Sequence, residues 1–339
     1  MISAQANPPS RFESVQVEWE DAPPATLKLY EDHTQTVLSR NLSPDIPFEY
    51  SLNPYRGCFH ACAYCYARPS HEYLGFGAGT DFDRKIVVKR RAPQLLEARF
   101  LRPSWVGDLI CFSGNTDCYQ PIEQRLGITR ACLEVCLRYR NPVSIITKST
   151  GILRDIELIA KLSRQAHVRV SVSIPFIDPV DARAIEPFVS PPLRRLAVVR
   201  ALSEAGVPVM VSLSPVIPGL NESQIPEILE AAREAGAVDA WMTPIRLEGS
   251  VVAVFEGRLR EAMPERADRV IAAIKRMRNG TLSGGGVGTR MTGHGAAWAS
   301  TVRLFNLCRH RLGFPGVPER PYPSTFRVPG RGRPCSLFA

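Results

Sequence analysis

The 339-residue chain lacks the two features that mark membrane-bound and exported proteins. No apolar run approaches the roughly 20 residues that a membrane-spanning helix needs. The first residues, MISAQANPPSRFESVQVEWE, contain no basic start followed by an apolar stretch. We therefore expect a cytoplasmic protein that binds no membrane. In such a chain, nine cysteines indicate metal ligation or burial more than disulfides.

Acidic residues are scarce toward the C-terminus. Residues 290–339 hold eight arginines against Glu319 alone, whereas residues 1–46 hold three basic and seven acidic residues. A basic patch is compatible with DNA as a partner, because phosphate contacts dominate the affinity for nucleic acid. On charge alone, a solvated arginine-rich surface explains the net charge of +9 equally well.

Regular patterns are missing from both ends of the chain. Residues 1–46 combine Pro, Gln, Ser and mixed charge, which predicts a loosely ordered N-terminal arm. Residues 251–339 include the run NGTLSGGGVGTRMTGHG and a tail rich in Pro, Gly and Arg, so we expect a C-terminal extension with a flexible basic tail. The regular core should span residues 47–250.

Within this core, apolar runs alternate with helical patterns. Runs rich in β-branched residues predict buried strands at 108–113, 142–148, 168–174, 208–214 and 238–244. Amphipathic patterns predict helices within 125–139, 151–166, 191–206 and 222–236. The alternation requires right-handed crossovers and a parallel α/β sheet, either open or curled into a full or partial barrel. In each form the reactive groups belong at the carboxyl ends of the strands.

Three cysteines lie close together in NPYRGCFHACAYCYARPS, at positions 58, 62 and 65. Soft thiolates select iron-sulfur clusters, zinc or Cu(I), and a cluster bound by only three cysteines leaves one iron open to another ligand. A structural zinc site is the alternative, with His60 or His71 as its fourth ligand. Zinc sites usually have two paired ligand sets, however, and no second Cys-x-x-Cys follows.

The segment Cys58-x-x-x-Cys62-x-Tyr64-Cys65 resembles the signature of the radical S-adenosylmethionine (SAM) superfamily. It follows a first strand candidate near PFEYSLN and precedes the alternating strands and helices. The resemblance implies a [4Fe-4S] cluster on the three cysteines, whose open iron binds the amino and carboxylate groups of SAM. It also implies an enzyme in which an electron splits SAM to a 5′-deoxyadenosyl radical, which abstracts hydrogen from a substrate. An electron donor such as flavodoxin or ferredoxin would serve it.

Further segments resemble the spore photoproduct lyase branch, often labelled DNA-repair-photolyase-like. The likeness covers about residues 47 to 245 and is carried by FSGNTDCYQPIE (112–123), ITKST (146–150), SVSIP (171–175), EPFVSPPLRRL (186–196) and SPVIPGLNE (214–222). It implies a partial (β/α)6 barrel of the TIM type, open enough for a large substrate. Where such lyases carry a hydrogen-donating cysteine this sequence has Gly114, which argues against thymine-dimer reversal by that route.

The resemblance places the SAM contacts at the ends of the barrel strands. Asp117, with Ser113 and Thr116 close by, follows the second barrel strand, where similar proteins meet the methionyl or ribose end of SAM. A helix N-cap is an equally good interpretation of Asp117.

The third and fourth barrel strands offer further polar candidates. Lys148 and Ser149 end the third strand, where a lysine can pair with the SAM carboxylate. Ser171 or Ser173 on the fourth strand would bond the ribose or carboxylate, although a serine in a buried strand often only satisfies backbone groups.

Arg194 lies in the first turns of a predicted helix, a poor place for a cation unless an anion faces it. We therefore expect it to pair with Glu186 or with the SAM carboxylate. Val216 and Ile217 occupy the region that cradles adenine in the superfamily, and Tyr64 would contact the adenine edge through its backbone.

The remaining cysteines are weaker signals. Cys132 and Cys136 are four apart on an apolar helix face, which indicates core packing, and Cys111 within a strand should be inert. Cys118 follows Asp117 near the expected site and is a candidate hydrogen donor. An auxiliary cluster from Cys308 and Cys335 has no support from spacing.

The chain ends in an apolar pair, Leu337 and Phe338, on a basic tail. An exposed apolar pair on a disordered tether suits docking into a partner groove, and this one resembles the Leu-Phe end of peptides that bind the bacterial DNA sliding clamp. A tail that folds back on its own barrel is the alternative.

Two classes of function remain open from the sequence. The first is a radical SAM enzyme that acts on nucleic acid, a peptide or a small molecule, and the second is a non-catalytic protein that binds nucleic acid and holds zinc or an iron-sulfur cluster. No motif in the sequence indicates that the protein recognises specific bases.

Overall fold

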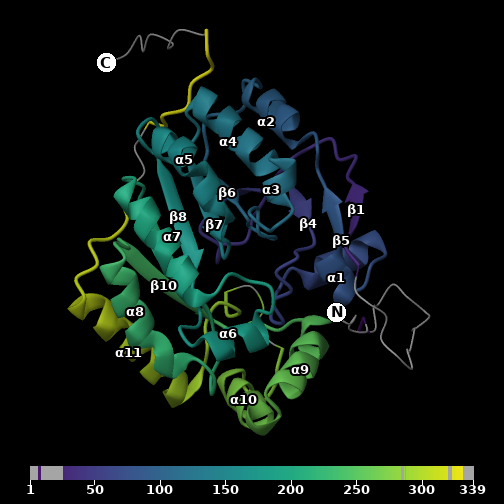
Figure 1. Ribbon diagram of the computed structural model, residues 1–339, viewed down its shortest axis with the longest axis vertical. Coiled ribbons are helices and arrows are strands. Elements are labelled where there is room, and N and C mark those ends of the chain that lie inside the picture. The colour runs from purple at the N-terminus through teal and green to yellow at the C-terminus, as the bar shows by residue number, and fades with distance from the viewer. Residues whose placement is uncertain (1–6, 9–25, 284–285, 287, 320–322, 331–339) are drawn as a thin grey trace.

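Six parallel strands form the centre of the main sheet (Figure 1). The computed structural model describes residues 7–8, 26–283, 286, 288–319 and 323–330. Its seven-stranded sheet has the order β10-β9-β8-β7-β6-β3-β2, and only β2 (Leu38–Arg40) is antiparallel, to β3 (Tyr50–Leu52). The five predicted strands are confirmed as β6 (Ile110–Phe112), β7 (Val143–Thr147), β8 (Val168–Ser173), β9 (Val209–Val216) and β10 (Asp239–Pro244).

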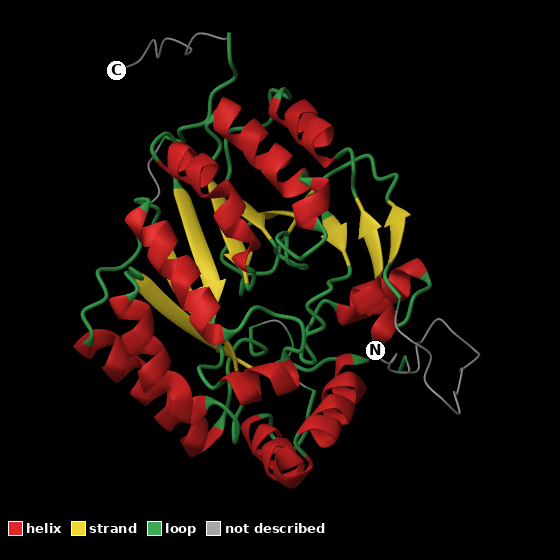
Figure 2. Ribbon diagram, viewed as in Figure 1, coloured by secondary structure: helices red, strands yellow, loops and turns green. Residues whose placement is uncertain are grey.

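Helices connect the parallel strands and cover the sheet, as Figure 2 shows. The crossovers contain α2 (Ala92–Phe100), α4 (Ile128–Tyr139), α5 (Ile156–Ser163), α7 (Pro192–Glu204) and α8 (Ile225–Glu234). The last two end as predicted, because Gly206 and Gly236 take positive φ angles of 75° and 94°. In the described chain β10 and β2 are the sheet edges and do not pair with each other, so the barrel is partial.

Two segments of the predicted N-terminal arm are strands. One is β2, and the other is β1 (Lys28–Glu31), which joins a smaller sheet with β5 (Lys85–Val88) and β4 (Tyr55–Arg56). All four residues of β1 are exposed. A short strand with no buried face has no hydrophobic alternation, so the sequence could not indicate it.

The predicted C-terminal extension also contains regular structure that sequence analysis missed. It forms α9 (Val251–Ala262), α10 (Pro264–Met277) and α11 (Gly295–Arg311). The core therefore continues past residue 250, where α10 buries an apolar face. The division of the chain at residues 46 and 250 stays a prediction.

Shorter helical segments shape the loops between these elements. They are η1 (Arg68–Leu74), α1 (Thr80–Arg84), α3 (Glu123–Leu126), η2 (Thr150–Asp155), α6 (Pro179–Ile185) and η3 (Glu222–Gln224). Across the described ranges, none of the helices combines the length and the apolar character that crossing a membrane requires. Cys335, Leu337 and Phe338 lie outside the described residues.

Candidate functional site

The three clustered cysteines lie in the loop between β4 and η1, called the cysteine loop here. Gly57 starts the loop with a positive φ of 80°. A side chain does not fit there, because a Cβ atom would lie 2.8 Å from the carbonyl oxygen of Phe82 in α1. The N–H of Cys58 donates to that same oxygen at 3.0 Å. Glycine before the first cysteine thus lets the loop lie directly against α1.

The thiols of Cys58, Cys62 and Cys65 are free and interact electrostatically. Burial raises the pKa of all three thiols. The charges of Asp117, Cys62 and Cys65 raise the pKa of Cys58 further, so the three sulfur atoms share one region. The Lys148 ammonium opposes this effect at Cys62 and Cys65, because a cation stabilises a nearby thiolate.

This donor set suits an iron-sulfur cluster better than zinc. Nowhere in the described parts of the chain do three His, Cys, Asp or Glu side chains surround one point as ligands of a single metal ion would. In a cluster, each thiolate binds a separate iron. The two candidate fourth ligands for zinc are buried. Nε2 of His71 lies 2.8 Å from the Lys85 carbonyl oxygen while its Nδ1 has no hydrogen-bond partner among the described residues, and Nδ1 of His60 lies 3.4 Å from the Asp117 carboxylate.

Arg68 anchors the cysteine loop and was not predicted. Its Nε and Nη2 donate to the Cys62 carbonyl oxygen at 3.1 and 3.0 Å. Its Nη1 donates to the carbonyls of Ala78 and Gly79, and Nη2 lies 2.9 Å from Asp83. The side chain is only 1% exposed. Its position three residues after Cys65 carries no signal that sequence reasoning could use.

A second buried arginine fixes the aromatic residue of the motif. The hydroxyl of Tyr64 donates to Glu186, whose other carboxylate oxygen accepts from Nη2 of Arg195 at 2.5 Å. Arg195 also donates to the carbonyls of Ser190 and Ser173. Burial, reinforced by the Glu186 charge, raises the pKa of Tyr64, so its hydroxyl remains a donor. Nζ of Lys148 lies 5.7 Å from the centre of the Tyr64 ring.

The predicted pairing of Arg194 with Glu186 is wrong, because the adjacent Arg195 occupies that place. Arg194 is exposed, whereas Arg195 is buried on the inner face of α7. The buried residues Arg195, Val198, Val199 and Leu202 follow a helical spacing of three and four, which is the signal that could have identified the inward arginine.

Asp117 joins the segment after β6 to the end of β7. Its carboxylate accepts from the Thr147 hydroxyl at 2.8 Å, from the Lys148 N–H at 2.8 Å and from the Tyr119 N–H at 2.9 Å. These donors, with His60 beside them, occupy its acceptor sites. Asp117 therefore holds neighbouring groups together, and it caps none of the described helices. Its predicted contact with SAM stays a prediction.

The neighbours of Asp117 also make contacts within the protein. The Ser113 hydroxyl accepts from the Cys118 N–H at 2.8 Å, and the Thr116 hydroxyl donates to the Tyr55 carbonyl at 2.6 Å. The Ser149 hydroxyl accepts from the Gly151 N–H at 3.0 Å, so it caps η2. Roles for these residues toward SAM stay predictions.

The predicted contacts on β8 and β9 are buried. Ser171 accepts from Nε1 of Trp241 at 3.1 Å, whereas Ser173 provides a carbonyl to Arg195. Val216 is the last residue of β9 and Ile217 follows it, and both are buried in the core. The Ile217 N–H donates to the side-chain oxygen of Asn221 at 2.7 Å. Their assignment to the ribose, carboxylate or adenine of SAM stays a prediction.

The other cysteines in the described ranges are buried. Cys111, Cys132 and Cys136 are fully buried, as expected. Cys118 is equally buried, and burial raises the pKa of its thiol. This position offers no support for a hydrogen donor, so that role stays a prediction. Cys308 is on α11, and its proposed partner Cys335 lies outside the described residues.

Gly114 is closely surrounded. A Cβ atom there would lie 2.7 Å from Cβ of Ser51. The Gly114 carbonyl accepts from the hydroxyl of Tyr66, which follows Cys65. A cysteine at position 114 would therefore require Ser51 to move or change.

Comparison with known families supports the motif. The model of the Radical SAM superfamily matches residues 52–232. An uncharacterized protein of Mycobacterium bovis is 38% identical over 226 residues, which is 66% of this chain and 66% of the relative. An uncharacterized protein of Methanocaldococcus jannaschii is 32% identical over 172 residues, which is 51% of this chain and 62% of the relative.

Solved structures support the fold. A mutant of spore photoproduct lyase with bound AdoMet and dinucleoside spore photoproduct superposes with a TM-score of 0.62. It is 16% identical, and the match covers 86% of this chain and 80% of that chain. A second spore photoproduct lyase structure, complexed with the dinucleoside spore photoproduct, gives the same TM-score over 85% of this chain and 80% of that chain.

Proposed function

Because the chain belongs to the radical SAM superfamily, we propose that Cys58, Cys62 and Cys65 hold a [4Fe-4S] cluster whose fourth iron binds SAM. The observation that carries this proposal is the presence of three free thiols in one loop, where Cys65 packs against Cys58. Three cysteines leave one iron of such a cluster open, as SAM binding requires.

The chain's own residues prepare the site for this cofactor pair. When bound, the reduced cluster supplies the electron that cleaves SAM to a 5′-deoxyadenosyl radical. Lys148 contributes positive charge beside Cys62 and Cys65, and we assign it to the SAM carboxylate. Asp117 holds the Lys148 backbone in place, so it acts as a positioning residue.

For the substrate, we propose a nucleic acid. The support is the net charge of +9 and a fold shared with spore photoproduct lyase, whose structures contain a dinucleoside spore photoproduct. Gly114 stands where spore photoproduct lyases carry their donor cysteine, so this chain has no thiol there, and the close packing hinders the addition of one. The product should therefore form without hydrogen return from that position, and the fold likeness does not extend to the lyase reaction.

Enzymes of this superfamily need a reductant, and we expect flavodoxin or ferredoxin to serve. A cytoplasmic location also stays a prediction. Docking of Leu337 and Phe338 on a DNA sliding clamp stays one as well, because both residues lie outside the described ranges.

The test is anaerobic reconstitution with iron and sulfide, followed by dithionite and SAM. We expect 5′-deoxyadenosine and methionine from the wild type and none from Cys62→Ala. Cys136→Ala is the matched control, because it removes a buried thiol outside the cysteine loop. Faster 5′-deoxyadenosine formation with DNA would support the substrate class. Product from Cys62→Ala, or a colourless zinc protein without product, would contradict the proposal.

A further inference from the structure

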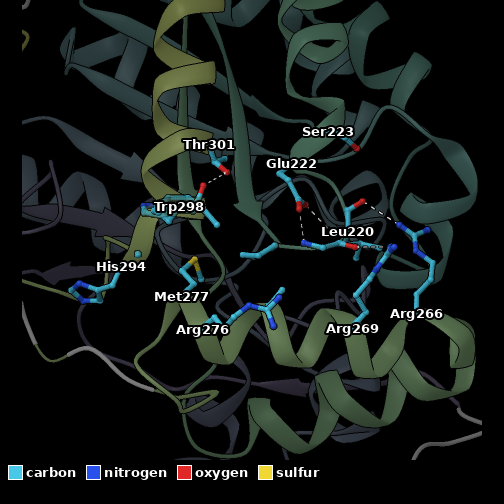
Figure 3. A pocket seen from close by; sticks show the side chains of 16 residues that line it. Leu220, Glu222, Ser223, Arg266, Arg269, Arg276, Met277, His294, Trp298 and Thr301 are labelled. Carbon is cyan, nitrogen blue, oxygen red and sulfur yellow. Dashed lines mark hydrogen bonds between the residues drawn. The ribbon is translucent and has the colours of Figure 1, made fainter.

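A pocket of about 590 Å³ lies between α10, the start of α11 and the loop after β9 (Figure 3). This volume is within the range of ligand sites, about 300–1,000 Å³. None of its lining residues belongs to the cysteine loop. Its lining residues Pro218, Gly219 and Leu220 directly follow Val216 and Ile217, which are predicted to cradle adenine. The pocket therefore adjoins the predicted SAM site, although it contains none of the residues assigned to SAM.

Three arginines line one side of this pocket. Arg266, Arg269 and Arg276 are spaced by three and seven residues, which places them on one face of α10. Arg266 is fixed by Asp181 at 2.6 Å and by the Leu220 carbonyl.

The other two arginines retain free donors. The side chain of Arg269 makes one long hydrogen bond, to the Gly219 carbonyl at 3.2 Å. The side chain of Arg276 makes no hydrogen bond to any other described residue. In those same ranges neither guanidinium has a carboxylate partner.

The carboxylate of the pocket does not neutralise these arginines. Glu222 is the acidic residue among the lining residues, and it accepts from the N–H groups of Gly219 and Leu220 at 2.7 and 3.0 Å. Glu222 keeps its negative charge, but one carboxylate against the two unpaired guanidinium groups leaves the pocket with a net positive charge, which favours an anion.

The apolar part of the lining connects the end of α10 with the start of α11. Met277 and Trp298 line it, and Gly293 packs so tightly against both that a Cβ would lie 2.7 Å from each. His294, the N-cap of α11, makes no side-chain capping bond. The positive end of the α11 dipole therefore adds to the arginine charge.

The spacing of the free arginines accommodates a ligand with more than one phosphate. Residues 269 and 276 are seven positions apart, about 10 Å along the helix axis at 1.5 Å per residue. Two phosphates along one nucleic-acid strand can therefore contact the two side chains at the same time. Proteins that bind single-stranded nucleic acid use a cationic groove that follows the phosphates, and the exposed Arg269 and Arg276 offer such a groove. Trp298, only 9% exposed, packs in the core beneath it.

We propose that this pocket binds the backbone of a single-stranded nucleic acid, with Arg269 and Arg276 on its phosphates. The site requires neither SAM nor a cluster, so it stands independently of the proposed function.

The test is the affinity of the full-length protein for a fluorescent 12-nucleotide oligo(dT), measured by anisotropy without SAM over a range of salt concentrations. Arg269→Ala with Arg276→Ala should weaken binding about ten-fold or more, since each charge-assisted contact contributes strongly. The slope of log affinity against log salt should fall by about 1.4, or about 0.7 for each lost phosphate contact.

A charge-matched control distinguishes this pocket from a general basic surface. Arg200 and Arg303 are exposed and lie outside the pocket. The double variant Arg200→Ala, Arg303→Ala should change affinity less than two-fold. An equal loss in both double variants would overturn the proposal.

A steric variant tests the cavity itself. Ala273 lines the pocket between the arginines, so Ala273→Leu should weaken oligonucleotide binding without changing charge. Unchanged binding by this variant would overturn the proposal. Equal competition by poly-glutamate, or binding of pyrophosphate without binding of oligo(dT), would overturn the nucleic-acid assignment.

One further variant separates this proposal from the cluster assignment. Cys62→Ala should bind oligo(dT) as the wild type does, because the pocket contains no residue of the cysteine loop. Loss of binding in this variant would place the nucleic acid at the cysteine loop instead.

Discussion

Arginine serves two opposite purposes in the two halves of this molecule. Around the cysteine loop, Arg68 and Arg195 are each 1% exposed, and their donors are directed at carbonyls and a carboxylate of the protein. On α10, Arg269 and Arg276 are exposed beside a cavity and lack carboxylate partners in the described ranges.

The buried arginines stabilise the fold, whereas the exposed arginines are able to bind a ligand. A buried guanidinium is tolerated only when its donors and charge are satisfied internally, so it has none left for a ligand. An exposed guanidinium contributes little to folding but retains its donors. Substitution should therefore reduce stability in the first pair and ligand affinity in the second.

The largest effect should come from Arg195→Ala. This change leaves Glu186 buried without its cation, and we expect the free energy of unfolding to fall by about 3–5 kcal/mol. Urea unfolding measures it. The neighbouring Arg194→Ala is the control and should cost under about 0.5 kcal/mol, because Arg194 is exposed. Similar losses from the two variants would remove the distinction between the arginine classes.

Arg68→Ala should cost about 3 kcal/mol, because it leaves several carbonyls and Asp83 without a donor. Burial raises the pKa of Asp83 to about 6, and Arg68 opposes that rise. A raised folded-state pKa means that ionising Asp83 reduces stability as the pH rises.

Without Arg68 the pKa of Asp83 should increase further. The stability difference between wild type and variant should therefore grow from pH 6 to pH 8. Unfolding curves at both pH values test this, and a pH-independent difference would show that Asp83 does not depend on Arg68.

Tyr64→Phe should have a smaller effect. It removes one donor to Glu186 while Arg195 remains, so we expect a loss of about 1–2 kcal/mol in unfolding free energy. Iron content after reconstitution should stay at the wild-type level. A large fall in bound iron would mean that the Tyr64 hydroxyl determines the shape of the cysteine loop itself.

The smallest effect on stability should come from Arg276→Ala, within about 0.5 kcal/mol of the wild type. Its affinity for oligo(dT) should nevertheless fall several-fold in the anisotropy assay. A substantial loss of stability with unchanged affinity would place Arg276 among the structural arginines.

The sequence predicted the parts of the fold that rest on long apolar runs. Strands β6 to β10 are such runs, and their burial made them recognisable. Helix α10 was missed although Ala267, Val270, Ile271 and Ile274 have helical spacing, because the surrounding Pro, Gly and Arg content suggested an irregular extension.

At the site, spacing alone identified the three cysteines, and their thiols do share one region. The support around them could not be predicted, because Arg68 bonds to carbonyls of Cys62, Ala78 and Gly79. Backbone acceptors leave no residue pattern. Arg194 was interpreted as a cation that needs an anion such as Glu186, but the helix phase, which was not considered, places Arg195 there instead.

The packing of Gly114 against Ser51 also bears on how enzymes of this fold diverge. A cysteine at position 114 alone would force its Cβ to within 2.7 Å of the serine Cβ, so the first mutational step is a destabilised protein. Ser51 must then shift or be replaced, for example by glycine. Where replacement is needed, a thiol at position 114 requires two coordinated substitutions, which makes that chemistry slow to arise by point mutation.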